Sequence, residues 1–577
     1  PQHHHRCYTN KATSQYIIGA MEGMEFLALA DENHSRNNWV RGSCRYGIMP
    51  ANGMTYAPPD QCYCSAGVKI LGLNALTSAQ EFPAEASVES RLARGAFYGE
   101  PVTEHANTPW PAYRKDALRS GSTTASVSAH VKPAWQVQLD PTITQPVVSE
   151  GRLFIASRDT HTIHALDPES GKSLWHFTAD GRVDSPPTCW KNLLLFGSAQ
   201  GTLFCVRQED GGLVWTFRAA PHERMIQSFE QLESAWPLHG SVLILDDLAY
   251  VAAGRSTFLD GGLYLYALEP STGKVVYRHQ ELGPFGDHTQ GEGHSFWTEG
   301  ARNDVLVSDG ESIFIMQLRF NKQLEPDLPQ TESLLGDRKF GRHVFSTAGF
   351  LDDEWYNRTF WMHSNMWPGF YLANQASKSG QLLVFNETTT FGVKAFWTRN
   401  RHSPMFFPGT KGYLLFADDN DSEPILVGRD KGDALTWLPE FNMSKGKKRK
   451  TNWGPNLGAA PQDSTVDAYT YNKDKGIGFT RNQEPQWSTY VPIRVKAMVS
   501  TSDKLFVAGA PDILDETDDP LGALEGRKGG VLRAVSSADG SKLSEYALDA
   551  PPVLDGLIAV NGKLFLATRD GKLTCWE

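Results

Sequence analysis

The densest group of residues that could do chemistry lies at the start of the chain. Four of the seven cysteines fall within the first 64 residues, close to a run of histidines. The group consists of His4, His5, Cys7, Cys44, Cys62 and Cys64. Thiolates and neutral imidazoles together suit borderline-soft ions, so these residues predict a site for Zn or Cu. Two disulfides, or reduced thiols, are the alternative interpretations.

A second group of polar residues falls at the predicted ends of strands, in WPLHGSVLI, AAGRSTFLDGG and GFLDDEWYNRTFW. Its members are His239, Arg255, Asp260, Asp352, Asp353, Tyr356 and Arg358. Arginine and paired carboxylates around a concave mouth could clamp a sugar or a carboxylate ligand, with a His or Tyr moving a proton. A ring of salt bridges between sheets is the alternative. No HExxH, GxSxG or phosphate-binding glycine loop occurs, so a conventional hydrolase triad has no support.

Strands in a repeating pattern must position these residues. The unit TQPVVSEGRLFIASRDTHTIHALDPESGKSLW, at residues 144–175, recurs at 185–215 and 241–277, and a shorter copy ends the chain. A period of about 40 residues with four strands is typical of the blades of a β-propeller. Asn-Gly and Asp-Gly turns supply the positive φ angles that tight hairpins need. We therefore expect an all-β propeller of four-stranded antiparallel blades, with eight blades.

The whole chain, 1–577, is predicted to form this single propeller. Residues 4–139 are expected to supply Cys- and His-rich blades with an insertion at 77–132. Residues 142–577 are expected to supply the repeat blades, with an insertion at 442–486. Insertions of this length are either functional lids or mobile linkers. Because the chain opens inside a strand pattern, it is predicted to be a fragment of a longer protein.

Composition narrows the classes of partner. The net charge is −11, which argues against a nucleic-acid partner. No apolar run approaches the roughly 18 residues that a membrane span needs. A small-molecule or polysaccharide ligand, or a protein partner, remains open.

The units ending ALDPESGKSLW and ALEPSTGKVVY resemble the repeats of PQQ-like, or quinoprotein-type, β-propellers, over most of residues 131–577. The segments HRCYTNKATSQYIIG and AGRSTFLDGG are similar to large PQQ-like repeat proteins of Planctomycetes. The resemblance implies an exported protein, periplasmic or extracellular. It also adds Ca²⁺ to the metals that the chain could bind. Quinoprotein dehydrogenases hold the quinone between a Trp and a disulfide of adjacent cysteines. This sequence has no adjacent cysteine pair, only Cys62-Tyr63-Cys64, which counts against PQQ.

Three functions therefore stay open. The first is an enzyme, an oxidoreductase or a lyase, that binds a carbohydrate or alcohol in the channel mouth, with or without a metal. The second is a binding or scaffold propeller without chemistry, such as the outer-membrane assembly lipoprotein of this fold. A PQQ-dependent dehydrogenase, disfavoured by the cysteines, and a polysaccharide lyase are further alternatives. An enzyme should bring titratable groups within about 4–6 Å of each other with shifted pKa values, whereas a scaffold should neutralise its charges in pairs.

Overall fold

The computed structural model consists of β-strands and their connections, and the residues it describes form no α-helix. It describes residues 9–577 except 21–22, 60–65, 68–69, 79–80, 83, 106–107, 229, 284–296, 330–337, 354–359, 368–376, 396–411, 424, 428–470, 473–476, 481–483, 514–518 and 520. Among the described residues, no helix is long and apolar enough to cross a membrane. The predicted all-β class with four-stranded antiparallel sheets is confirmed.

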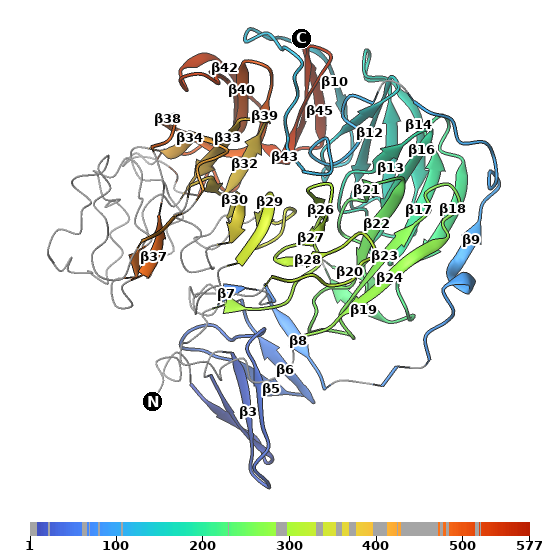
Figure 1. Ribbon diagram of the computed structural model, residues 1–577, viewed down its shortest axis with the longest axis vertical. Helices are drawn as coiled ribbons and strands as arrows, with labels where there is room; N and C mark the ends of the chain where they lie inside the picture. Colours follow the sequence, from blue (N-terminus) through green and yellow to red (C-terminus); the bar gives the residue numbers. More distant parts are fainter. Residues whose placement is uncertain are drawn as a thin grey trace, which may run out of the picture.

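In the described part of the chain, eight sheets of three or more strands follow one another around a common axis (Figure 1); we call them the ring. The first three are β11 (Val147–Ser149), β12 (Arg152–Ser157), β13 (Thr162–Leu166) and β14 (Ser173–Thr178); β15 (Thr188–Trp190), β16 (Leu193–Gly197), β17 (Thr202–Arg207) and β18 (Leu213–Arg218); and β21 (Leu243–Leu245), β22 (Leu248–Ala253), β23 (Leu263–Leu268) and β24 (Val275–Glu281). The next two have three strands each: β26 (Val307–Ser308), β27 (Ile313–Ile315) and β28 (Leu318–Phe320); and β29 (Arg338–Ser346), β30 (Trp361–Trp367) and β31 (Ser379–Gly380). Then come β32 (Leu382–Phe385), β33 (Thr389–Lys394), β34 (Tyr413–Asp419) and β38 (Trp487–Val491); and β39 (Ile493–Ser500), β40 (Lys504–Pro511), β41 (Gly530–Ser536) and β42 (Lys542–Leu548). Because parts of 284–483 lie outside the description, the count of eight blades stays a prediction.

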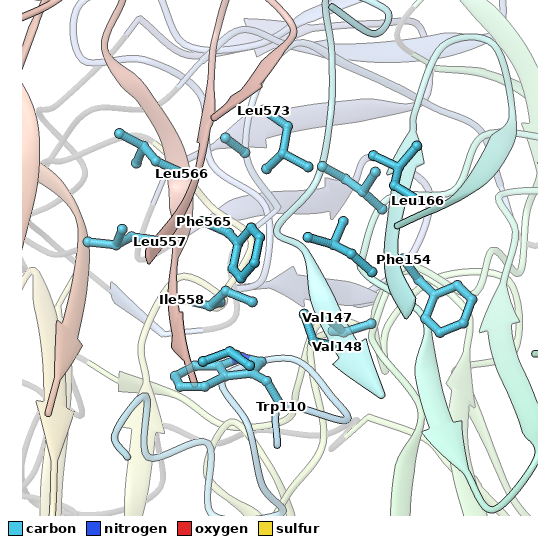
Figure 2. Packing of buried hydrophobic residues seen from close by; sticks show 14 of the residues in the cluster. Trp110, Val147, Val148, Phe154, Leu166, Leu557, Ile558, Phe565, Leu566 and Leu573 are labelled. Atoms are coloured by element: carbon cyan, nitrogen blue, oxygen red, sulfur yellow. The ribbon is translucent and has the colours of Figure 1, made fainter. Parts of the chain in front are cut away.

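The last sheet closes the ring by joining the two ends of the repeat region. Its strands β43 (Pro552–Val560), β44 (Lys563–Thr568) and β45 (Lys572–Trp576) come from the end of the chain, and β10 (Pro133–Gln138) pairs antiparallel with β45. The Gln145 side chain donates a hydrogen bond to the carbonyl of Leu554 at 2.6 Å, which links this sheet to the β11–β14 sheet. Figure 2 shows the shared apolar packing, with Ile558 and Phe565 on one side and Val147 and Val148 on the other.

Burial explains why these sequences become blades. The central strands β12 and β16 are buried along almost their whole length, because each sheet packs between two neighbours. The outer strand β14 instead alternates between half-buried and exposed residues. The strands of a sheet therefore become less buried from the central strands to the outer strand.

A tryptophan from one sheet docks on a glycine turn of the next. The indole N–H donates to a backbone carbonyl of that turn, in the pairs Trp135–Pro168 at 3.1 Å, Trp175–Gln208 at 3.0 Å, Trp215–Pro270 at 2.9 Å and Trp487–Ser537 at 2.8 Å. A Cβ on the turn glycine would strike the indole ring at Gly171, Gly211, Gly273 and Gly540, all of which have positive φ. Glycine is thus required at these turns both by backbone conformation and by the close approach of the ring.

The predicted insertion 77–132 wraps around the ring and then fills its axis. Strand β9 (Leu92–Arg94) adds a fifth strand to the outer edge of the sheet that ends in β18. The chain then passes Asn192, whose side-chain oxygen accepts the N–H of Thr103 at 3.1 Å. Asn192 lies in the turn between β15 and β16, so the insertion reaches the axis from the end where the inner strands finish.

Residues 108–125, here called the axial segment, bond to the inner strands of several sheets. The backbone pairs are Trp110 with Val148, Pro111 with Cys189, Ala117 with Ser308, Ser120 with Phe385, and Gly121 and Thr123 with Ser500. Figure 2 shows the indole of Trp110 packed below Ile558 and Val148. The segment therefore occupies the axis at the C-terminal ends of the inner strands.

The N-terminal residues were predicted to supply blades of the ring, but the structure places them outside it (Figure 1). We call residues 9–76 the N-terminal module. It contains the sheet β1 (Lys11–Ala12), β2 (Tyr16–Gly19), β3 (Met24–Ala28) and β4 (His34–Asn37), and the sheet β5 (Met49–Ala51), β6 (Met54–Ala57) and β8 (Asn74–Leu76). Short strand β7 (Ala66–Gly67) pairs in parallel with β25 (Trp297–Thr298). The first sheet is four-stranded, like a blade, but Ile17 and Leu27 are exposed on one face, whereas a blade needs two buried faces.

Two further small sheets lie between the blades. Strands β19 (Met225–Ser228) and β20 (Gln231–Ser234) form a hairpin, and β35 (Ile425–Val427), β36 (Tyr471–Asn472) and β37 (Ile477–Thr480) form a three-stranded sheet. The rest of the predicted insertion 442–486 lies largely outside the described residues.

Candidate functional site

The polar residues that were predicted to form a site lie on one side of the ring, the side on which the inner strands begin. His239 precedes β21, and Asp352 and Asp353 follow β29. Arg255 and Asp260 lie in the loop from β22 to β23. Tyr356 and Arg358 lie outside the described residues.

His239 contacts a carboxylate that the sequence analysis did not single out. Its Nδ1 lies 2.6 Å from Oδ2 of Asp184, and Asp184 also binds Arg158 at 2.8 Å and Arg182 at 2.6 Å. Although burial alone would raise it, the hydrogen bond with His239 and the two guanidinium groups hold the pKa of Asp184 well below its usual range. Arg182 also binds Glu233 at 2.8 Å. This group is a charge-compensated network with His239 at its edge.

Arg255 and Asp260 bind each other directly. Asp260 also binds Arg224 at 3.1 Å, so its carboxylate is shared between two guanidinium groups. On the other side of the axis, Asp353 binds the ammonium of Lys496 at 2.5 Å. Each of these charged groups thus has a group of opposite charge beside it.

A different carboxylate, Asp304, is not neutralised. It is 3% exposed and comes just before β26. Its Oδ1 accepts the N–H groups of Val305 at 2.8 Å and Phe350 at 2.7 Å. Its Oδ2 is buried and has no hydrogen-bond partner among the residues that the structure describes. An unsatisfied buried carboxylate oxygen is rare in folded proteins and requires an explanation.

Burial raises the pKa of Asp304 to about 7, and the negative charge of Asp352 adds to the rise. The two N–H donors and Arg302 oppose this rise without cancelling it. Asp304 also raises the pKa of the buried Tyr113 of the axial segment, on which burial and Asp555 have the larger effect. The carboxyl group of Asp304 thus changes charge near neutral pH, next to other titratable groups.

Unsatisfied polar atoms concentrate around Asp304. Buried atoms without a hydrogen-bond partner include Asp304 Oδ2, Asn303 Oδ1, Gln317 Oε1, Arg302 Nε and Arg255 Nε; we call these five residues the mouth site. Backbone and side-chain contacts tie them together, because Asn303 N–H donates to the carbonyl of Arg255 at 3.1 Å. Gln317 Nε2 donates to the carbonyl of Ser346 at 3.0 Å, in the segment that leads to Phe350.

Arg114 and Tyr113 of the axial segment anchor this end of the axis. Arg114 Nη1 lies 2.6 Å from Oδ1 of Asp555, and the Tyr113 hydroxyl donates to Oδ2 of Asp555 at 2.7 Å. The carbonyl of Phe350 lies 3.1 Å from the same hydroxyl. Because Phe350 also donates its N–H to Asp304, this anchor is directly linked to the mouth site.

The predicted metal site cannot be placed. His4, His5, Cys7, Cys62 and Cys64 lie outside the described residues, and Cys44 lies in the turn before β5. Among the residues that are described, no group of three His, Cys, Asp or Glu side chains could hold a metal ion. Within the ring, Cys189, Cys205 and Cys575 are buried free thiols. Zn or Cu binding, or disulfides, at the N-terminus therefore stay predictions.

The sequence analysis missed Asp304, Asn303 and Gln317 because none belongs to a motif. Asp304 had one available signal, namely that it precedes a strand at the same point of the repeat as Asp184. Asp352 and Asp353 were predicted as site residues because they are adjacent carboxylates, but the carboxylate of Asp353 forms an ion pair with Lys496.

Residues 120–288 match the family model described as "Outer membrane protein assembly factor BamB". The quinoprotein alcohol dehydrogenase PedH of Pseudomonas putida is 26% identical over 88 residues, which cover 14% of this chain and 15% of that protein. The chain thus matches only a small part of the length of this curated relative.

Two solved structures are also similar. BamB from Moraxella catarrhalis has 12% identity and a TM-score of 0.39, with 78% of this chain and 98% of that chain covered. Quinohemoprotein alcohol dehydrogenase from Comamonas testosteroni has 14% identity and a TM-score of 0.42, with 82% and 81% covered.

The residues present do not fit a quinone held between a Trp and a disulfide of adjacent cysteines. No two cysteines are adjacent in the sequence, and the three described in the ring lie within β15, β17 and β45. On the axis, Trp361 is covered instead by the guanidinium of Arg114, 4.8 Å from its ring centre. The family match over residues 120–288 and the repeated four-stranded sheets nevertheless agree: this chain has the β-propeller fold, and that part of it is similar to PQQ-like repeat proteins.

Proposed function

We propose that this protein binds a small hydroxylated ligand, a carbohydrate or an alcohol, at the mouth site. The observation that supports this proposal is the group of buried, unpartnered polar atoms around Asp304. Leaving each such group without a partner costs about 1–3 kcal/mol, so their concentration in one place favours a role in binding.

The chemistry of these atoms favours hydroxyl groups. Asn303 Oδ1 and Gln317 Oε1 are acceptors, and the Nε atoms of Arg255 and Arg302 are donors. A hydroxyl group both donates and accepts, so a ligand with several hydroxyls could satisfy both kinds of atom. Asp304 can act in either sense, because its pKa of about 7 lets it donate when protonated and accept when ionised.

The same property favours a chemical role for Asp304. A group whose pKa lies near the working pH is the most effective general acid or base. Asp304 would accept the proton of a ligand hydroxyl, and Arg302 would stabilise the negative charge that develops. We infer no step through a quinone.

A scaffold without chemistry is the second candidate. The pairwise neutralisation of Asp184 and Asp260 supports it, because these charges at this end of the ring would then serve stability. The matched family is named as an outer-membrane assembly factor, which favours a protein partner and an exported location, periplasmic or extracellular.

Saturation-transfer NMR with D-glucose, D-galactose, glycerol and ethanol tests the proposal. Wild-type protein should bind at least one of these probes, and Asp304→Asn, which turns the free acceptor into a donor, should weaken that binding at least tenfold. Asp116→Asn is the matched control, because both oxygens of Asp116 already accept hydrogen bonds from Ser120, at 3.0 and 2.5 Å, on the axial segment. Equal binding by Asp304→Asn and wild type, or no binding of any probe by wild type, would contradict the proposal and favour the scaffold.

A further inference from the structure

The N-terminal module touches the ring at the loop that carries part of the mouth site. The rings of Trp39 and Phe258 are stacked, with centres 5.6 Å apart and planes 8° from parallel. Trp39 packs against the apolar core of the module, which contains Ile18 and Val40. Phe258 packs against the apolar core of the ring around β23 and β27. The stack therefore joins two hydrophobic cores that are otherwise separate.

The module side of this contact is fixed by its own backbone. The carbonyl of Trp39 accepts the N–H of Ile70 at 2.9 Å, and the carbonyl of Val40, the next residue, accepts the N–H of Met24 at 2.8 Å. Trp39 thus lies where both sheets of the module meet, so its position reports the position of the module as a whole.

On the ring side, the loop of Phe258 is bonded to the segment that carries Arg302, Asn303 and Asp304. Thr257, which is fully buried, donates its N–H to the carbonyl of Ala301 at 2.9 Å. Two residues earlier, the carbonyl of Arg255 accepts the N–H of Asn303 at 3.1 Å. Four of the five mouth-site residues, namely Arg255, Arg302, Asn303 and Asp304, thus take part in these bonds or lie one residue away from them.

Packing between the two segments leaves little freedom. A Cβ on Gly300 would lie 2.5 Å from Oγ1 of Thr257 and 3.0 Å from the ring of Phe258. Gly300 also has a positive φ of 108°, which L-residues rarely adopt. A displacement of Phe258 must therefore move residues 300–304, because interiors packed this closely transmit strain.

We propose that Trp39 and Phe258 are positioning residues, through which the N-terminal module holds the mouth site in its binding geometry. The role of the site as a ligand site rests on the function proposed above. The mechanical link between the module and residues 255–262 and 299–305 does not, and can be tested without a ligand.

Hydrogen exchange measured by mass spectrometry on the full chain is the test. Trp39→Ala should raise exchange in peptides covering 255–262 and 299–305 at least tenfold, and leave peptides of β11 to β17 unchanged. Trp39→Phe keeps a stacking ring and should restore wild-type exchange. Phe258→Ala repeats the test from the ring side, in case Trp39→Ala disrupts the module.

Tyr16→Ala is the matched control, because Tyr16 contacts Phe26 inside the module, with ring centres 5.7 Å apart, and has no aromatic contact with the ring. Tyr16→Ala should leave exchange in 255–262 and 299–305 unchanged. Wild-type exchange in both alanine variants at the stack, or an equal rise in every peptide of the ring, would overturn the proposal.

Binding of D-glucose and glycerol to the same variants separates the two proposals. Weaker probe binding in Trp39→Ala, recovered in Trp39→Phe, supports both of them. If hydrogen exchange in 255–262 and 299–305 rises in Trp39→Ala but wild-type protein binds no probe, the result supports the mechanical link and contradicts the ligand site. Probe binding that is unchanged in Trp39→Ala and in Phe258→Ala overturns the positioning role.

Discussion

Replacing Asp555 by Asn should weaken the whole fold, because it removes the only acidic partner described for a buried arginine. Arg114 and Asp555 have side chains that are each 2% exposed, and their charged atoms lie 2.6 Å apart. The substitution preserves shape but leaves the guanidinium without a counter-charge. Removing one partner of a buried ion pair costs about 3–5 kcal/mol.

The hydrogen bond from Tyr113 to Asp555 should weaken as well, since its acceptor loses its charge. We therefore expect Asp555→Asn to lower the free energy of unfolding by about 3–5 kcal/mol. Urea denaturation followed by tryptophan fluorescence would measure this loss. Limited proteolysis should show earlier cleavage within 108–125, because both lost contacts anchor the axial segment.

Two comparisons make the result decisive. Glu169→Gln removes an ion pair of similar length, 2.6 Å from Lys563, but Glu169 is 72% exposed and its loss should cost no more than about 1 kcal/mol. The double variant Arg114→Met, Asp555→Leu removes both charges and should recover most of the stability. A loss below about 1 kcal/mol in Asp555→Asn, equal to that of the surface control, would refute the reasoning.

Three further predictions follow from individual contacts. Asp304 has a pKa of about 7 in the folded protein against 3.8 in a model peptide, so the folded state binds the proton more tightly and wild-type stability falls as the pH rises from about 4 to about 7. In urea titrations at a series of pH values, Asp304→Asn should gain up to about 4 kcal/mol relative to wild type over this interval. A difference that stays constant with pH would contradict the assignment. Trp215→Ala should cost about 3–5 kcal/mol in thermal or urea unfolding, because this fully buried indole fills the space over Gly273, and a loss under about 1 kcal/mol would show that the docking contact is unimportant. Arg255→Ala should abolish probe binding with a stability change below about 1 kcal/mol, since Asp260 keeps Arg224 as a partner; a large drop in melting temperature would instead favour a purely structural ion pair.

The repeat predicted the ring well because its signals are local. Trp175 and Gly211 are conspicuous residues at fixed places in the unit, and their docking follows from residue size and turn geometry alone. The position of the N-terminal module could not be predicted in this way. Its strands carry the same turns and apolar residues as a blade, and only the exposure of Ile17 and Leu27 distinguishes them.

The mouth site was predicted only in part, for a physical reason. Arg255 belongs to the proposed mouth site and Asp352 raises the pKa of Asp304, but the proposal depends on Asp304 itself, whose pKa is shifted by burial and by neighbours from other segments. Its bond to Phe350 spans 46 residues, and the bond from Phe350 to Tyr113 spans 237 residues. Residues that are so far apart in the sequence form no motif of fixed spacing, so their contacts could not be predicted.

The path of the axial segment has a consequence for how the protein is made. Residues 108–125 leave the ribosome before every described ring strand except β9, and the next strand, β10, has to wait for its partner β45. The sheets must therefore assemble around a segment that is already present, and the ring can close only after β45 has been made. A circular permutant that begins at β11 and carries residues 1–146 at its end would have to insert the axial segment into a preformed ring, so it should fold much more slowly than the natural order of the chain.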